Sequence, residues 1–239
     1  SVDEGVNYIV LTDEGIDEKY AAIPSLLAVS AVHHHLISVQ KRVQTALIVK
    51  SGEIREVMHA ALLLGYGASA INPYMAFAVL DDLVKRGEVQ MNYETAEKNY
   101  IKALCKGLYK VMSKMGISTI RSYRGAALFE SLGVGSAVLD KYMGGGLSQI
   151  EGITMEDIAS DIVAAHRDAF CSEKGERSAG VSASLPDYGR YAWRKEGEQH
   201  GWDPSKIRLL HKSLRENNRD IFKEFSSAVE NRQNPMYLR

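Results

Sequence analysis

The feature that most constrains the fold is an alternation of short apolar runs and helix-length segments in the first third of the chain. Residues 7–11, 45–50 and 68–72 are rich in β-branched and apolar side chains, and each run ends at polar or turn-forming residues. Residues 24–39 and 53–64, between the runs, have helical patterning. Parallel neighbours need a long return path, so three such strands imply right-handed βαβ crossovers. The sequence predicts an α/β fold with parallel strands, either doubly wound or barrel-like.

More helices are predicted after the third strand. Residues 74–85 and 96–115 carry apolar side chains at helical spacing. Another helix is expected to begin at Thr154, because Asp157 follows three positions later as in a capping box. Residues 117–132 mix helical and β-rich signals, so both a strand and a helix end remain open there.

The composition changes near residue 172 and divides the chain into three parts. We expect an α/β core at residues 1–171 and a flexible linker at 172–187, which is rich in Ser, Gly and charged residues. Residues 188–239 are predicted to form an aromatic and helical extension, with one amphipathic helix over 204–231. The aromatic cluster of this extension consists of Tyr188, Tyr191, Trp193 and Trp202.

Charge and hydropathy exclude several classes of function. The 29 basic residues are balanced by 30 acidic ones, so no field gathers nucleic-acid phosphates. The longest apolar stretch, residues 23–32, is about half of the ~20 residues that a membrane span needs. The two cysteines make no disulfide framework, and no secretory signal opens the chain, so we expect a reducing cytoplasm. Beginning on Ser1, the sequence is expected to be a piece of something longer.

Isolated motifs for metal, phosphate or nucleophile chemistry are weak. His33, His34 and His35 are adjacent, whereas chelation from a helix needs partners three or four positions apart, and His59 does not change this. The glycines at 144–146 lack the order of a dinucleotide or P-loop motif. Cys105 has no histidine near it in sequence to act as its base, so it is expected to be a small core residue. Structural roles are therefore favoured, and no metal site is predicted.

Polar residues follow each predicted strand, at the edge where α/β proteins place function. They include Thr12, Asp13 and Glu14 after the first strand and residues 50–56 after the second. Such residues suit a site that binds a small organic acid or a flavin, but they are equally typical of a solvated loop or a domain interface. We favour the loop or interface.

Four collinear segments resemble the central region of the glutamate synthase large chain. They are residues 22–37, 51–56, 64–74 and 110–126, with weaker likeness at 189–193 and 220–223. In that family, an N-terminal glutaminase domain releases ammonia, which travels inside the protein to a flavin domain that converts 2-oxoglutarate to glutamate. The central domain lies between them and is a degenerate relative of the flavin-binding barrel. The resemblance thus implies an incomplete (β/α) TIM-barrel-like domain.

The family's functional residues have no counterparts here. The chain lacks an N-terminal nucleophilic cysteine and a closely spaced cysteine cluster. The resemblance therefore implies no catalytic, cofactor-binding or metal-binding residue in this chain; FMN and an iron–sulfur cluster are expected only in the parent enzyme. What it carries over is location, because two segments mark a plausible interdomain or tunnel-facing surface. The candidate residues are Ile23, Pro24, Ser25, Ser51, Glu53 and Arg55.

The leading interpretation is a non-catalytic scaffold segment of glutamate synthase that spaces the glutaminase and FMN domains and helps to wall the ammonia path. The isolated chain is expected to be inactive and to self-associate. A free-standing flavin-binding α/β oxidoreductase is the alternative, and a subunit of a split enzyme is a third reading. Whether NADPH, NADH or ferredoxin donates the electrons is left open, because the docking elements for the donor lie elsewhere.

Overall fold

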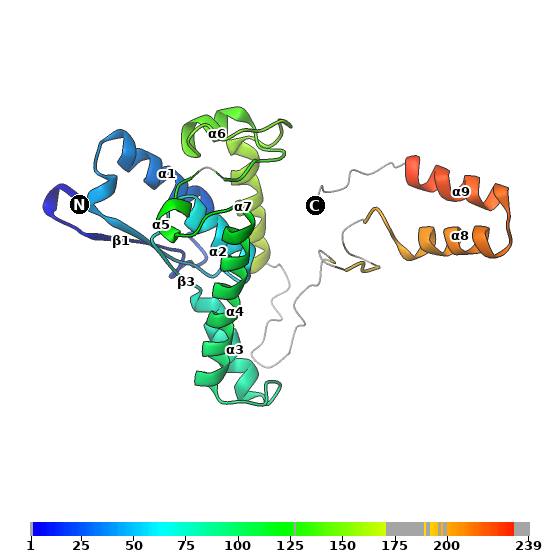
Figure 1. Cartoon of the computed structure of the whole chain (residues 1–239), viewed down its shortest axis with the longest axis horizontal. Helices are drawn as coiled ribbons and strands as arrows, with labels where there is room; N and C mark the ends of the chain where they lie inside the picture. The colour runs from blue at the N-terminus through cyan, green and yellow to red at the C-terminus, as the bar shows by residue number, and fades with distance from the viewer. Residues whose placement is uncertain are drawn as a thin grey trace. The chain divides into compact units, whose positions relative to one another are not determined.

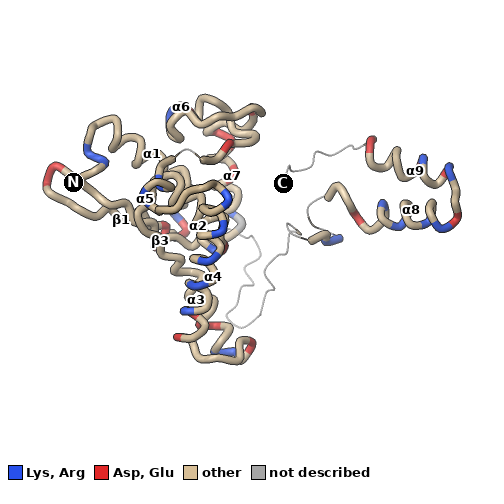
Figure 2. The backbone as a smooth tube through the Cα atoms, viewed as in Figure 1, with Lys and Arg blue, Asp and Glu red and all other residues tan. Residues whose placement is uncertain are grey.

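The computed structural model describes residues 2–126, 128–170, 189, 192–195, 197 and 200–231. It divides into two compact units, Ser1–Glu173 and Lys174–Arg239 (Figure 1). Basic and acidic positions occur on the helices of both units (Figure 2). The predicted linker, 172–187, lies outside the described residues.

A parallel three-stranded sheet forms the centre of the first unit. Its strands are β1 (Tyr8–Thr12), β2 (Ala46–Lys50) and β3 (Ala70–Asn72), in the order β1-β2-β3. β1 and β2 pair along their whole length, and β3 pairs with the second half of β2. The three predicted strands and the mixed α/β class are confirmed, although β3 begins two residues later than the apolar run.

The crossover helices cover one face of this sheet. They are α1 (Ser25–Ser38) and α2 (Val57–Gly65), and the 3₁₀ turn η2 (Arg42–Gln44) leads from α1 into β2. Leu47 and Val49 of β2 are fully buried beneath them. The other face is largely open, since Tyr8 is 68% and Val10 53% exposed. Strand alternation thus gives one face to the core, and no described element of the first unit covers the exposed side chains of the other.

The helices α3 (Tyr74–Lys85) and α4 (Tyr93–Lys114) follow the sheet. α3 has the predicted bounds, while α4 begins earlier than predicted because Asn92 caps it, accepting a hydrogen bond from Thr95 N at 2.9 Å. Gly107 lets α4 approach α2: a Cβ at this position would lie 2.2 Å from Val57 Cγ2.

The ambiguous stretch 117–132 contains one short helix, α5 (Ile120–Tyr123), and no regular strand among its described residues. Ser131 instead forms a single parallel bridge with Ser148. Two further helices complete the unit, α6 (Ser136–Tyr142) and α7 (Met155–Phe170). Asp157 accepts hydrogen bonds from Thr154, which confirms the predicted helix start.

Two predicted helices were wrong in extent. The second does not begin at residue 53 but at Val57, because the preceding residues form a loop held by hydrogen bonds. The single helix expected over 204–231 is two helices, α8 (Pro204–Arg215) and α9 (Arg219–Glu230). Asn217 takes a left-handed conformation with φ of 44° and ends α8, while the Asn218 side chain caps α9.

The second unit is built on the pairing of these two helices. The rings of Trp202 and Phe225 stack with centroids 5.9 Å apart, so Trp202 joins the helical pair. Tyr188 and Tyr191 of the expected aromatic cluster lie outside the described residues. Throughout the described part of the chain, no helix is both long enough and apolar enough to cross a bilayer.

Candidate functional site

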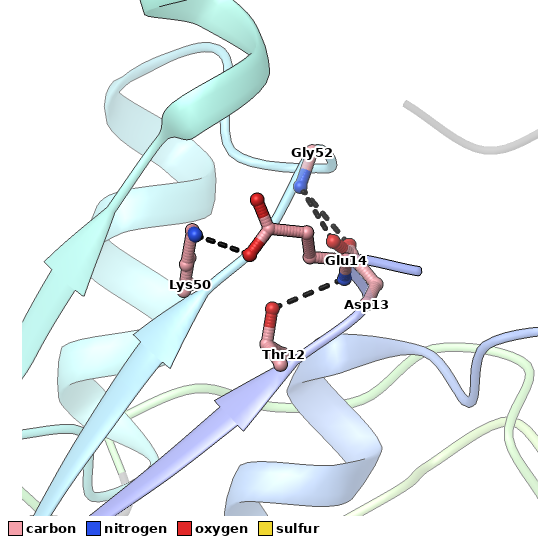
Figure 3. Close-up of polar contacts among 5 residues, drawn as sticks. All are labelled: Thr12, Asp13, Glu14, Lys50 and Gly52. Atoms are coloured by element: carbon pink, nitrogen blue, oxygen red, sulfur yellow. Dashed lines mark hydrogen bonds and ion pairs between the residues drawn. The ribbon is translucent and has the colours of Figure 1, made fainter. Parts of the chain in front are cut away.

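The candidate face lies where the loops after β1 and β2 meet, at the carboxyl ends of the strands. Asp13 is the centre of this junction. The Ser51 hydroxyl donates to its Oδ2 at 2.6 Å. Gly52 N donates to the same oxygen at 3.0 Å, and Figure 3 shows this contact between Gly52 and Asp13. Charge-assisted hydrogen bonds of this kind are stronger than neutral ones. One carboxylate therefore fixes the two loops against each other.

Ser51 is the buried connector of the network. Its side chain is only 1% exposed, and its backbone N–H donates to Asn72 O at 3.1 Å. The Ser51 hydroxyl also accepts a hydrogen bond from Glu53 N at 3.1 Å. With Asp13 as its acceptor and Glu53 N as its donor, this hydroxyl is committed to structure rather than poised as a nucleophile.

Glu53 ties the same loop to the start of α1. Its Oε2 accepts hydrogen bonds from Ser25 N at 2.8 Å and from the Ser25 hydroxyl at 2.5 Å. Pro24, the residue at the N-cap position of α1, provides no side-chain cap, so Glu53 satisfies an N–H at the helix start from a distant loop. The carboxylate also lies at the positive end of the helix dipole.

A second set of contacts lies beside Asp13. Lys50 forms an ion pair with Glu14, and its Nζ lies 5.5 Å from the centroid of the Tyr74 ring (Figure 3 shows the Lys50–Glu14 pair). Burial, followed by a hydrogen bond to Asp13, raises the pKa of the Tyr74 hydroxyl. Tyr74 thus stays protonated at neutral pH and acts as a donor at this edge.

Two adjoining cavities open on this network. One, of about 370 Å³, is lined in part by Ile23, Ser25 and Ser51, and Ile23 is 65% exposed. The other, of about 720 Å³, is lined in part by Ser25, Glu53 and Arg55. The structure therefore brings five of the six candidate residues to one region.

Pro24 is the exception. It lines a different cavity, of about 300 Å³, together with Leu27, Tyr66 and Phe129. Arg55 reaches the candidate region with its backbone anchored, since its N–H donates to His59 Nδ1 and its carbonyl accepts from the Tyr100 hydroxyl. Its side chain is exposed at the mouth of the larger cavity.

The adjacent histidines have separate protein partners. His33 Nδ1 accepts a hydrogen bond from Arg42 Nε at 2.8 Å, whereas His34 Nδ1 donates to Ser30 O at 2.8 Å. His59 receives the bond from Arg55 N. Within the described residues, no three His, Cys, Asp or Glu side chains group as metal ligands.

The glycine turn at residues 144–146 packs against a helix, and the described cysteine lies exposed on another helix. Gly144, with φ of 70°, packs so closely on α1 that a Cβ would lie 2.1 Å from His34 Nε2. The turn thus serves close packing against a helix, which only glycine allows. Cys105 is a free, exposed thiol on α4, not the small core residue that the sequence suggested, and Cys171 lies outside the described residues.

Sequence reasoning missed the central role of Asp13. The sequence did carry a signal for it, because Asp13 directly follows a strand and therefore lies at the carboxyl edge of a parallel sheet. It also missed the linkage of His33 to Arg42, nine positions apart across the end of α1, for which no spacing rule exists.

Comparison with known proteins gives a consistent result. Residues 1–135 match the family model of the glutamate synthase central domain. The glutamate synthase [NADPH] large chain of Bacillus subtilis (strain 168) is 40% identical over 96% of this chain, and the glutamate synthase [NADH] of Schizosaccharomyces pombe is 40% identical over 95%. The ferredoxin-dependent glutamate synthase of Pyropia yezoensis is 37% identical over 96%.

The matched region is a small part of each relative. The chain spans 15% of the Bacillus subtilis protein, 11% of the Schizosaccharomyces pombe protein and 15% of the Pyropia yezoensis protein. The likeness nevertheless extends over nearly the whole of this chain, and the family model covers more than half of it. This chain belongs to the glutamate synthase central domain family.

Proposed function

We propose that the chain is the non-catalytic central scaffold of a glutamate synthase, the enzyme that makes two glutamates from glutamine, 2-oxoglutarate and a reductant. In this role it spaces the glutaminase and FMN domains and forms part of the wall of the ammonia path. Its partners are those two domains of the same enzyme. The exposed thiol of Cys105 fits a reducing, cytoplasmic setting.

The observation that carries this proposal is the closed hydrogen-bond network at the carboxyl ends of the strands. Asp13, Ser51, Glu53 and Ser25 use their polar atoms on one another. Ser51 is only 1% exposed and its hydroxyl is hydrogen-bonded to both Asp13 and Glu53 N, so it is out of reach of a substrate, which suits a wall rather than a nucleophile. This network makes the loops rigid and leaves Ile23 exposed beside them.

The open face of the sheet supports an incomplete (β/α) barrel. In β1 and β2 the residues that face away from the helices alternate in register, so Tyr8 lies beside Ala46 and Val10 beside Ile48. In a closed barrel such side chains fill the interior in layers. Three strands with helices on one face and apolar side chains on the other therefore resemble a sector of that architecture.

Cofactors of the parent enzyme do not fit this chain. An iron–sulfur cluster is held by about four thiolates, and the sequence has two cysteines. The glycine turn at 144–146, the natural candidate for a flavin phosphate, is occupied by close packing of Gly144 on His34. We therefore assign FMN and the cluster to other domains of the parent enzyme. The relatives named for NADPH, NADH and ferredoxin are 37% to 40% identical to the chain, so this segment does not distinguish the electron donor.

Two measurements test the scaffold role on the isolated chain. Glutamate synthesis from glutamine or ammonia should not exceed background, and purified protein should be colourless and resist loading with FMN. Robust turnover would overturn the proposal. A visible flavin spectrum would favour the free-standing oxidoreductase.

The wall of the ammonia path is tested in the full-length enzyme. Ile23→Trp adds bulk to an exposed side chain that lines the smaller cavity. We expect glutamine-dependent glutamate synthesis to fall roughly tenfold or more while glutaminase activity persists, because ammonia would be obstructed after its release. Synthesis from added ammonium should fall less, since free ammonia can enter by other routes.

The matched control is Val79→Trp, at a 51% exposed apolar position on α3 away from the candidate face. It should leave the ratio of glutamine-dependent to ammonium-dependent synthesis unchanged. Equal effects of the two substitutions on that ratio would show that Ile23 lines no path for ammonia.

A further inference from the structure

A cavity of about 680 Å³ lies at the opposite edge of the sheet, where the strands begin. Three arginines line it: Arg42 from η2, and Arg121 and Arg124 from α5 and the residue after it. None of the residues that line this cavity is acidic. The cavity therefore concentrates positive charge in a chain whose total charge is close to zero.

Arg42 is held in a fixed orientation. Its Nε donates to His33 Nδ1 at 2.8 Å, while Nη1 donates to Thr45 O and Nη2 to Gly67 O, both at 2.7 Å. These bonds leave one hydrogen on each terminal nitrogen uncommitted. A guanidinium that is fixed in this way loses little freedom when it binds a further acceptor.

The other two arginines retain donors as well. Arg124 Nη1 donates to Ser69 Oγ at 3.1 Å, which is the only hydrogen bond of its side chain within the described residues. The Arg121 side chain is exposed and has no hydrogen bond or ion pair to any part of the chain that the structure describes. No described carboxylate lies within ion-pair distance of any of the three.

The charges act on each other across the cavity. Burial, and then repulsion by Arg124, lowers the pKa of Arg42. Burial, followed by Arg42, His34 and Arg124, lowers the pKa of His33 to about 4, so the imidazole is neutral and adds no charge. Thr45, buried in the same wall, has a hydroxyl without a hydrogen-bond partner among the described residues. The cavity therefore holds uncommitted hydrogen-bond donors and positive charge, while none of the residues that line it carries a negative charge.

We propose that Arg42, Arg121 and Arg124 form an oxyanion-binding site that accepts a carboxylate or phosphate group. Guanidinium groups bind both oxyanions through paired N–H donors. The oxyanion comes from one of two sources, a free small anion or an acidic side chain of another segment of the enzyme. The exposed side chains of Tyr8 and Val43 also line the cavity and give either ligand an apolar surface to contact. The site lies at the other edge of the sheet from the candidate ammonia wall and does not depend on it.

Isothermal titration calorimetry of the 239-residue chain at low ionic strength measures whether the site binds oxyanions. The probes are inorganic phosphate and N-acetyl-glutamate amide, which presents one side-chain carboxylate, each compared with chloride at matched ionic strength. Saturable binding above the chloride baseline is expected. It should weaken by roughly tenfold or more in the double variant Arg121→Gln/Arg124→Gln, because two charge-assisted contacts are removed.

The control variant is Arg167→Gln, which removes one positive charge from an exposed position on α7 and should bind both probes as the parent chain does. Tighter binding of phosphate would indicate a free anion as the source, whereas tighter binding of the glutamate analogue would indicate a protein carboxylate. The proposal is overturned by binding of both probes no better than chloride, or by equal binding in the double variant. Circular dichroism of each variant verifies that the fold is intact.

Discussion

At the scale of single residues, His33 should make the stability of the chain depend on pH. Its folded pKa is about 4, against 6.5 for the free side chain, because burial and nearby Arg42 disfavour the charged form. The unfolded chain therefore binds more protons between these values, so stability is complete above pH 6.5 and is lost as the pH falls towards 4. The loss reaches up to about 3 kcal/mol. Urea unfolding at several pH values measures it.

His33→Asn provides the control, because an amide oxygen can accept the hydrogen bond from Arg42 Nε without titrating. The variant should show a flatter stability curve between pH 6.5 and 4. Hydrogen bonds from Thr154 lower the pKa of Asp157 below 3.8. The stability that this carboxylate contributes is therefore lost below about pH 3.8, outside the range in which His33 is tested. A steep decline that persists in the variant would assign the pH dependence to other groups.

Individual residues also show how far sequence reasoning reaches. Strand direction places Ser51 and Glu53 at the carboxyl edge of the parallel sheet, so the position of these two residues in the fold could be predicted from the sequence. The partners of those side chains were not predictable. Glu53 bonds to Ser25, 28 positions earlier, and Ser51 bonds to Asp13, 38 positions earlier. Such pairs depend on how two loops pack, which no local pattern encodes.

At the scale of elements, Gly107 controls the approach of α4 to α2. Gly107→Ala should destabilise the fold by roughly 1–3 kcal/mol, because the new Cβ would lie 2.2 Å from Val57 Cγ2. Alanine favours the helix over glycine by about 1 kcal/mol, which offsets only part of the free-energy cost of this overlap. Val57 cannot easily rotate away, since β-branched side chains are restricted in χ1. Thermal or urea denaturation gives the difference in unfolding free energy.

A double-mutant cycle separates overlap from other effects. Val57→Ala removes the methyl groups that Gly107→Ala would strike, so the double variant should be more stable than the sum of the two single changes predicts. A strictly additive result would mean that the two helices move apart without strain.

The elements at the two ends of the chain differ in how well they were predicted. β1, β2 and α3 have strong periodicity and clear stops, and the structure has them within one residue of the expected bounds. The predicted helix over 204–231 was wrong because the apolar pattern continues through the turn at Asn217 and Asn218. Two consecutive asparagines, one suited to left-handed φ and one to capping, were the available signal.

At the scale of the whole chain, each unit exposes apolar surface. In the first unit this is the open face of the sheet, with Tyr8 and Val10. The fold class was predictable because crossover lengths dictate parallel strands. The choice between a doubly wound sheet and a barrel was not, since local periodicity is the same for a parallel strand in either architecture. Both exposed surfaces suit a segment that meets other domains.

The paired helices α8 and α9 leave part of their apolar surface exposed. Leu214 is 69% and Phe222 45% exposed, so the pair retains apolar surface after its own packing. We predict that this surface packs against a neighbouring domain of the parent enzyme, and that the isolated chain self-associates through it. In sedimentation velocity, Leu214→Ser/Phe222→Ser should shift the chain towards monomer, whereas Lys212→Ser on α8 should not. Hydrogen exchange at Leu209, Leu210 and Leu214 should be slow; unfolded-chain rates throughout α8, or a monomer at all concentrations, would contradict this docking.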